Sequence, residues 1–410
     1  MLMTLIPLFD EEMKVKAYSV FAQKNNYLLN PMMMGTARFD GATSIQGLEV
    51  IQAMGIETIS DDVDIFVPIS NINVFTDVDS QCGDIPHNRI VFLIDNTIPP
   101  IDMYISRLED LKKRGFGLAI RKLAVSEFES YKAVLQLMDY VFLNNKKVAI
   151  DKAKIYFSKL YPHIKLCAGN IETAEIFEQL KKGGGYQFYE GVFYRTPLTK
   201  GEKEVAPLKV NYIKLLNIVN SENFELSEAA DTIGRDTALT ISLLRMVNNM
   251  TVNSGITTIR HAAAMLGQRE LKKWINTAVV NALCADKANE VTRLSLLRAK
   301  FAENLAPAFE MAALKDELFL MGLFSVLDVI LDRSMEEALN MMTVVDDIKK
   351  ALVDRTGKLV KVYDFMIQYE EANWPEISRQ MIIENLDDGV ITGAYMDALE
   401  WYKNVMTGKN

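Results

Sequence analysis

Residues 164–193, IKLCAGNIETAEIFEQLKKGGGYQFYEGVF, contain one complete strand–helix–strand unit. The apolar runs Ile164–Cys167 and Phe188–Phe193 predict two strands. Between them, Phe177 and Leu180 belong to a series of apolar residues at helical spacing, and a run of three glycines ends the predicted helix. Repeated units of this kind build an α/β sheet or barrel.

The same alternation of strands and helices extends back towards the N-terminus. Five further runs predict strands: Val15–Phe21, Ile65–Ile69, Ile90–Ile94, Gly117–Ile120 and Tyr140–Leu143. Several of these runs are apolar almost throughout, which is typical of parallel strands covered on both faces. Seven strands favour a TIM-type (β/α) barrel in which one strand is irregular or missed.

The pattern changes at residue 199. The segment TKGEKEVAP at 199–207 is polar and ends in a proline, which predicts a linker. Beyond it, apolar residues recur almost only at helical spacing, and Asp236 is positioned to cap a helix over Thr237–Asn249. We therefore predict an α/β barrel domain at 1–198, a linker at 199–207 and an all-α domain at 208–410.

Composition narrows the class of protein. The chain has 410 residues, 49% of them hydrophobic and 24% charged, which is typical of a globular protein. Its formal charge of −9 disfavours a dedicated nucleic-acid binder. The three cysteines Cys82, Cys167 and Cys284 lie far apart and favour a reducing cytoplasm. No uncharged apolar stretch reaches the ~18–20 residues that a membrane helix needs, so we expect no membrane span.

Motifs of common enzyme chemistry are absent from the sequence. The three histidines are His87, His163 and His261, and none is followed by aspartate or paired at metal-ligand spacing. No glycine-rich phosphate loop and no nucleophile elbow is present. The sequence therefore predicts no metal and no cofactor.

Four stretches carry a resemblance to known families. CAGNIETAEIF at 167–177 and YQFYEGVFYRTPL at 186–198 resemble segments of the EAL domain, the barrel that hydrolyses cyclic di-GMP in bacterial signalling. LSEAADTIGRDTALTISLLRMVN at 226–248 and ITTIRHAAAMLGQRELKKWI at 256–275 resemble the HDOD domain, a helical relative of the HD phosphohydrolases. Together they resemble the EAL–HDOD signalling proteins over nearly the whole chain.

The resemblance implies that the metal-ligand positions of an EAL barrel have been replaced. The first metal-binding Glu falls on Ser19, the Asn ligand on Pro68, and the first Glu of the Glu-x-x-Glu segment on Phe92. The paired Asp ligands fall on Arg121 and Lys122. Since Mg²⁺ and Mn²⁺ need several oxygen ligands, these residues predict that no metal binds.

The remaining active-site positions have changed as well. The Arg that holds the ligand phosphate falls on Gln23, the catalytic Lys on Phe142, and the general-base Glu on Gly169. The Gln that precedes the last glycine falls on Glu190. We therefore expect no catalytic residues and no phosphodiesterase activity.

Two acidic positions match the family. Asp95 and Glu172 fall where the family supports a loop without binding the metal. Arg121 and Lys122 leave open an anion-binding role, with cyclic di-GMP as the candidate ligand.

The leading hypothesis is a catalytically inactive barrel that acts as a scaffold or ligand sensor, coupled to a helical domain that binds a partner protein. One alternative is residual cyclic di-GMP phosphodiesterase activity. Another is a nucleic-acid-binding regulator, because 226–248 also fits a helix-turn-helix with Arg235 and Arg245 as nearby cations.

Overall fold

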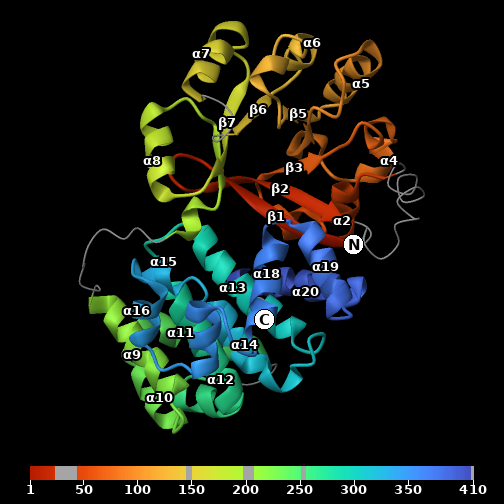
Figure 1. Ribbon diagram of the computed structural model, residues 1–410. Helices are drawn as coiled ribbons and strands as arrows, with labels where there is room; N and C mark the ends of the chain where they lie inside the picture. The colour runs from red at the N-terminus through yellow and green to blue at the C-terminus, as the bar shows by residue number, and fades with distance from the viewer. Residues whose placement is uncertain (24–43, 145–149, 197–206, 251–254, 408–410) are drawn as a thin grey trace. The chain divides into compact units, whose positions relative to one another are not determined.

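The computed structural model describes residues 1–23, 44–144, 150–196, 207–250 and 255–407. The chain forms two compact units, each built from two segments (Figure 1). The first unit contains Met1–Tyr194 and Ile367–Gly393, and the second contains Arg195–Met366 and Ala394–Asn410. Residues 367–393 therefore belong with the first unit, although the sequence assigns them to the all-α domain. Most of the predicted linker, 199–206, lies outside the described residues.

The first unit is built on a closed barrel of eight strands in sequence order. The strands are β1 (Leu2–Phe9), β2 (Val15–Gln23), β3 (Asp64–Pro68), β4 (Ile90–Ile94), β5 (Gly117–Ile120), β6 (Tyr140–Asn144), β7 (Lys165–Ile171) and β8 (Phe188–Gly191). Neighbours from β2 to β8 are parallel, whereas β1 is antiparallel to both β2 and β8. The barrel and its seven predicted strands are confirmed, and the missed strand is β1.

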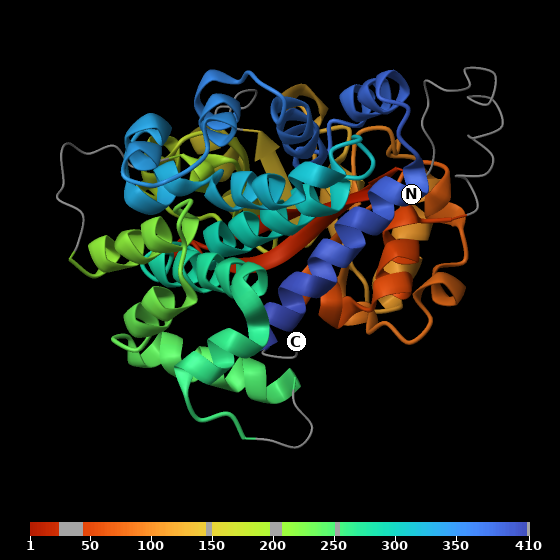
Figure 2. The same cartoon turned by 90° about the horizontal axis from the view of Figure 1, so that it is seen from below.

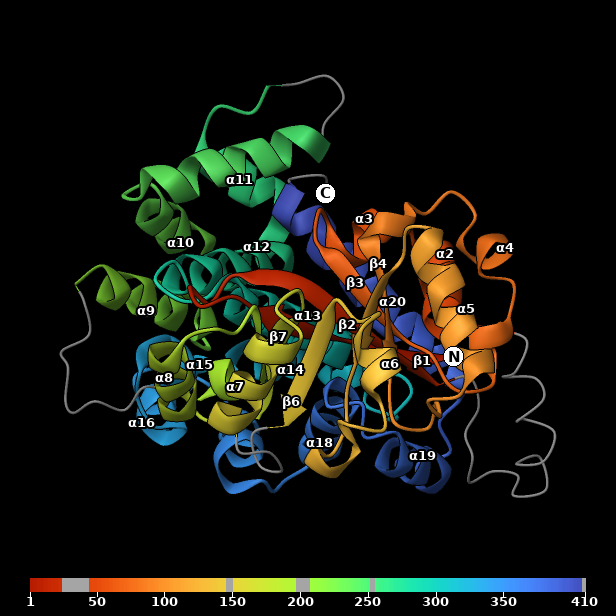
Figure 3. The same cartoon turned by 90° about the horizontal axis from the view of Figure 1, so that it is seen from above.

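Helices surround the strands, and Figure 3 shows α2, α5, α7 and α8 outside the barrel. The helices of the barrel are α2 (Gln46–Met54), α3 (Ile56–Ser60), α4 (Val78–Cys82), α5 (Asp102–Lys113), α6 (Lys132–Leu135), α7 (Ile150–Leu160) and α8 (Ala174–Gly183). Short 3₁₀ turns include η1 (Asn73–Phe75) and η2 (His87–Arg89). Gly115 follows α5 with φ of 94°, a left-handed conformation that ends the helix before β5.

Apolar side chains fill the barrel interior. The inward-facing cluster contains Leu8, Ala17, Phe66, Val91, Leu93, Ala119, Tyr140, Phe142, Cys167 and Phe188. The Phe66 ring packs edge-on against Tyr140, Phe142 and Phe188, with centroids 5.2, 5.6 and 6.0 Å away. This aromatic layer makes the interior a packed core, as is usual for eight-stranded barrels.

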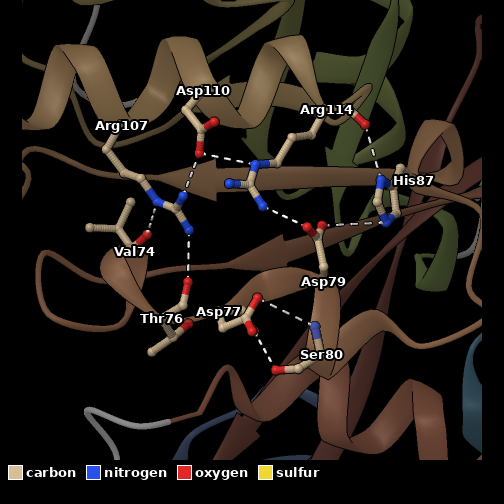
Figure 4. A network of polar contacts seen from close by, with 9 residues as sticks. All are labelled: Val74, Thr76, Asp77, Asp79, Ser80, His87, Arg107, Asp110 and Arg114. Atoms are coloured by element: carbon tan, nitrogen blue, oxygen red, sulfur yellow. Dashed lines mark hydrogen bonds and ion pairs between the residues drawn. The ribbon is translucent and has the colours of Figure 1, made fainter.

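A polar network holds α5 against the segment that follows β3 (Figure 4). Arg107 donates from Nε to the Val74 carbonyl at 2.8 Å and from Nη2 to the Thr76 carbonyl at 2.7 Å. Arg114 connects Asp110 (Nε to Oδ2, 3.0 Å) with Asp79 of α4 (Nη1 to Oδ2, 2.6 Å). The side-chain hydrogen bond from Arg114 lowers the pKa of Asp110. The outer helices of this part of the barrel are thus positioned by charge as well as by packing.

The second unit is all helical. Its helices are α9 (Pro207–Asn220), α10 (Leu226–Ile233), α11 (Thr237–Met250), α12 (Ile259–Leu283), α13 (Asn289–Leu305), α14 (Lys315–Phe324), α15 (Leu327–Leu331), α16 (Met335–Asn340) and α17 (Asp346–Lys349), with a π-helical turn at Lys350–Asp354. Figure 2 shows α9, α10 and α11 as a green group beside α12, against which each of them packs.

Three more helices complete the described chain. Two of them, α18 (Val360–Glu370) and α20 (Asp388–Thr407), contribute residues to both units. The third, α19 (Trp374–Ile383), lies wholly in the first unit.

The predicted cap of α11 is confirmed. The Leu239 N–H donates to Asp236 Oδ1 at 2.9 Å, which makes Asp236 the N-terminal cap of α11. Thr258 caps α12 in a similar way by accepting a hydrogen bond from the His261 N–H at 3.3 Å. Gly267, with φ of 74° and ψ of 171°, bends α12.

The packing of α13 against α14 depends on a glycine. A Cβ atom at Gly322 would lie 2.3 Å from the Arg298 carbonyl oxygen, far closer than van der Waals contact. The Cβ would be fixed to the backbone of α14, and the oxygen belongs to the backbone of α13. The clash can therefore be relieved only by moving one helix.

We expect Gly322→Ala to destabilise the protein by about 3 kcal/mol or more, because the helices must separate. Gly393→Ala is the matched control, since a Cβ there meets no atom within 4 Å in α20. It should be neutral or stabilising by roughly 0.5–1 kcal/mol. Urea denaturation followed by circular dichroism measures both changes, and equal free energies of unfolding would contradict the packing argument.

A partly buried charge cluster joins α12 to α13. Glu303 accepts hydrogen bonds from Lys273 at 2.7 Å and Lys300 at 3.0 Å, and its side chain is 11% exposed. Burial alone would raise the pKa of Glu303, but the hydrogen bonds and charges of the two lysines outweigh it and hold the pKa below its usual 4.5.

The pKa of Glu303 is thus lower in the folded protein than in the unfolded chain. The stability that Glu303 contributes to the folded protein is therefore present above pH 4.5 and is lost as the pH falls through the folded pKa. We expect the free-energy difference between wild type and Glu303→Gln to be largest at neutral pH and to shrink below about pH 4.5. Glu400→Gln, at an exposed position of α20, is the control. A Glu303→Gln difference that stayed constant from pH 7 to pH 3 would exclude the proposed ion pairing.

Candidate functional site

The carboxyl ends of β2 to β8 meet at one end of the barrel, where binding residues of such barrels gather. Side chains alternate along each strand, so the residue two positions after a core residue also faces inward. By this rule five residues face the barrel mouth, each two positions after a residue of the inward-facing cluster. They are Ser19 after Ala17, Pro68 after Phe66, Arg121 after Ala119, Gly169 after Cys167 and Glu190 after Phe188. Five of the predicted site positions are thereby brought together, and Phe142 lies in the aromatic layer itself.

An ion pair occupies this mouth. Arg121 Nη2 donates to Glu190 Oε1 at 3.1 Å, and the two side chains are 23% and 11% exposed. The guanidinium carbon lies 5.3 Å from the centroid of the Phe21 ring and 5.9 Å from that of Phe142. Arg121 therefore reaches from β5 to side chains of β2, β6 and β8, and places a fixed positive charge above the aromatic layer.

The pair is joined through one atom of each group. Arg121 Nη1 and Glu190 Oε2 are buried, and neither makes a hydrogen bond to the described residues. The same holds for Ser19 Oγ on β2. These atoms make the mouth polar above an apolar core, and each carries a desolvation cost.

Glycine at 169 leaves room beside Glu190. A Cβ atom at Gly169 would lie 3.9 Å from Glu190 Oε1, so a carboxylate at this position would stand next to a second carboxylate. Cys167, two residues earlier, is inert. Burial raises the pKa of its thiol, and the nearby Glu190 carboxylate adds to the effect.

Arg121 and Lys122 do not face a common site. Lys122 adopts a left-handed φ of 61°, its side chain is 67% exposed, and Nζ lies 3.3 Å from Asp95 Oδ2. Each cation thus has its own carboxylate partner, and anion binding by the two stays a prediction.

The two acidic positions matched to the family lie after strands. Asp95, after β4, accepts hydrogen bonds from the Thr97 N–H at 3.0 Å and hydroxyl at 2.6 Å. Burial raises its pKa, but Thr97 and Lys122 outweigh burial, and the net shift is downward. Asp95 therefore contacts Thr97 of its own loop and Lys122, the second residue after β5. Glu172 is exposed directly after β7. Their role as loop supports stays a prediction.

Two predicted positions lie away from the mouth's centre. Phe92 faces the opposite side of β4 from Val91 and Leu93, and its ring packs 4.8 Å from Phe116. The inward residue at this level is Leu93. Gln23, at the end of β2, donates from Nε2 to Ser378 Oγ at 3.2 Å.

Among the described residues no group of three or more His, Cys, Asp or Glu side chains converges. At the mouth Glu190 is already held by Arg121, and a guanidinium repels a divalent ion.

Comparison with known proteins identifies the second unit. The HDOD domain family matches residues 205–361. The helical unit carries an HDOD domain.

Two relatives share most of the chain. Cyclic di-GMP phosphodiesterase CdgJ from Vibrio cholerae is 27% identical over 326 residues, which cover 78% of this chain and 75% of CdgJ. The uncharacterized protein YuxH from Bacillus subtilis is 24% identical, with 98% of each chain covered.

The N-terminal barrel resembles EAL domains. The EAL domain of DcpA from Mycobacterium smegmatis is 16% identical and covers 46% of this chain and 89% of its own, with a TM-score of 0.35. YkuI from Bacillus subtilis, solved with cyclic di-GMP and calcium, is 15% identical and covers 66% of this chain and 73% of its own, with a TM-score of 0.37.

The HDOD domain offers a shallow surface pocket between α10 and α12. Its lining includes Arg235, Thr258 and Arg260, and Arg260 forms an ion pair with Asp231 at 2.9 Å. Of the two cations weighed for nucleic-acid binding, Arg235 lines this pocket and Arg245 is exposed on α11. No helix among the described residues is long and apolar enough to cross a bilayer.

The ion pair at the barrel mouth can be tested by a double-mutant cycle. We expect Arg121→Met to cost about 3 kcal/mol of unfolding free energy, because Glu190 would remain buried and unpaired. Adding Glu190→Met should recover most of that loss. Lys122→Met breaks the exposed pair with Asp95 and should cost less than about 1 kcal/mol. Additive losses in the double variant would show that the two side chains do not interact.

Proposed function

We propose that this protein is a signalling protein with a catalytically inactive EAL-like barrel. The barrel acts as a scaffold or ligand sensor, and the HDOD domain binds a partner protein. The observation that supports the proposal is the ion pair of Arg121 and Glu190, which occupies the barrel mouth where the EAL resemblance places metal ligands. A cytoplasmic location stays a prediction from the three buried, unpaired cysteines.

The physical argument concerns charge. Metal-dependent hydrolysis requires a divalent ion that activates water and stabilises the developing negative charge. The mouth instead holds the guanidinium of Arg121, which carries a positive charge of its own. Every ~1.4 kcal/mol of lost transition-state stabilisation lowers the rate tenfold, and loss of the metal removes several kcal/mol.

A residual cyclic di-GMP phosphodiesterase is the second candidate. It is favoured by the similarity to CdgJ, which is named as such an enzyme, and by the carboxylate of Glu190. Cyclic di-GMP also stays a candidate ligand without turnover, because Arg121 Nη1 has no partner among the described residues. A nucleic-acid role through Arg235 and Arg245 has weaker support, since the chain carries a net charge of −9.

Hydrolysis and binding should be measured side by side on the full chain. We expect no linear product from cyclic di-GMP with Mg²⁺ or Mn²⁺, because no metal-activated water forms. An active EAL phosphodiesterase run in parallel verifies the reagents.

Turnover that disappears in Glu190→Met would contradict the proposal and establish the phosphodiesterase. Calorimetric titration with cyclic di-GMP, with and without Mg²⁺, then separates a sensor from a scaffold. Heat of binding without turnover identifies a ligand sensor, whereas neither binding nor turnover leaves a scaffold.

A further inference from the structure

The first strand of the barrel has an open edge. β1 pairs with β2 along its whole length but with β8 only through Phe9 and Tyr189. The other edge of residues 2–8 therefore has no strand partner among the described residues. An open edge presents unpaired N–H and C=O groups and invites association. Yet Leu2, Met3 and Thr4 are each only 1% exposed, so other parts of the protein must cover them.

Residues 367–393 contribute hydrogen bonds to this edge. The Met3 N–H donates to Tyr369 Oη at 3.1 Å in a buried contact, which satisfies one of the backbone groups that no strand reaches. Thr392 donates from Oγ1 to the Met1 carbonyl at 2.8 Å. The hydroxyl groups of α18 and α20 thus take the place of part of a neighbouring strand.

The same segment reaches the rim of the barrel mouth at the end of β2. Strand alternation from the core residue Ala17 puts Gln23 on the inward face, and Gln23 donates a hydrogen bond to Ser378 on α19. The two residues are 4% and 1% exposed, so this contact is nearly dry. A hydrogen bond in such surroundings is costly to break.

The segment is also continuous with the HDOD side of the chain. Residues 360–366 of α18 belong to the second unit and 367–370 to the first. In α20, residues 388–393 belong to the first unit and 394–407 to the second. No loop interrupts either helix at these points.

We propose that residues 367–393 form a clamp on the open edge of β1, and that the HDOD side of the chain acts on the barrel mouth by tightening or loosening this clamp through α18. The proposal goes beyond the proposed function and does not depend on whether the barrel hydrolyses a nucleotide. Turnover would refute the inactive barrel and leave the clamp untouched.

The first test measures amide hydrogen exchange in the full chain. Tyr369→Phe keeps the ring and removes the acceptor, so the Met3 amide should exchange about fivefold to tenfold faster. Ser378→Ala should do the same at the end of β2. Tyr363→Phe is the control, because it lies on α18 but in the second unit, where its ring contacts Arg355. An unchanged Met3 rate in Tyr369→Phe would overturn the clamp.

The second test loosens α18 from the HDOD side. Phe309→Ala removes a ring that packs 5.4 Å from Phe365 of α18. We expect faster exchange at Met3 and Gln23, and Phe309→Leu is the milder variant if alanine prevents folding. Leu243→Ala, a buried change in α11, is the matched control for a general loss of stability. If both variants accelerate Met3 exchange equally, global unfolding explains the effect and transmission through α18 is excluded.

Discussion

The charge pair of Arg121 and Glu190 is the constraint on which the mouth of the barrel depends. The aromatic layer below cannot hydrate a guanidinium, so the charge of Arg121 needs a partner close by. Glu190 supplies that partner, and the faces of Phe21 and Phe142 supply the rest of the surroundings. Gly169 fits the same requirement, because a larger acidic residue there would compete with Glu190 for one cation.

A guanidinium and a divalent ion make different demands on a barrel. The ion needs several oxygen ligands in a defined geometry, whereas the guanidinium accepts one carboxylate and two aromatic faces. In this barrel Arg121 contacts one carboxylate and two aromatic faces, and Ser19 and Leu93 face inward as well. The eight strands close around these side chains.

The sequence predicts most of the fold because its signals are local. Seven strands and the cap at Asp236 follow from periodicity and capping chemistry. β1 escapes prediction because a single apolar run at the N-terminus has no flanking helix to mark it. The site is harder to predict because it depends on side-chain direction. Strand alternation puts Phe92 on the opposite face of β4 from Leu93, and Arg121 and Lys122, adjacent in sequence, pair with different carboxylates.

The contribution of residues 367–393 to the barrel lies beyond any local signal, since Met3 and Tyr369 are 366 positions apart. Pairings over such separations carry a loop-closure cost that no local pattern reports. Without them, β1 would offer an apolar edge, LMTLIPLF, that is prone to associate with other chains. This edge is covered by chain that lies beyond the HDOD match at 205–361.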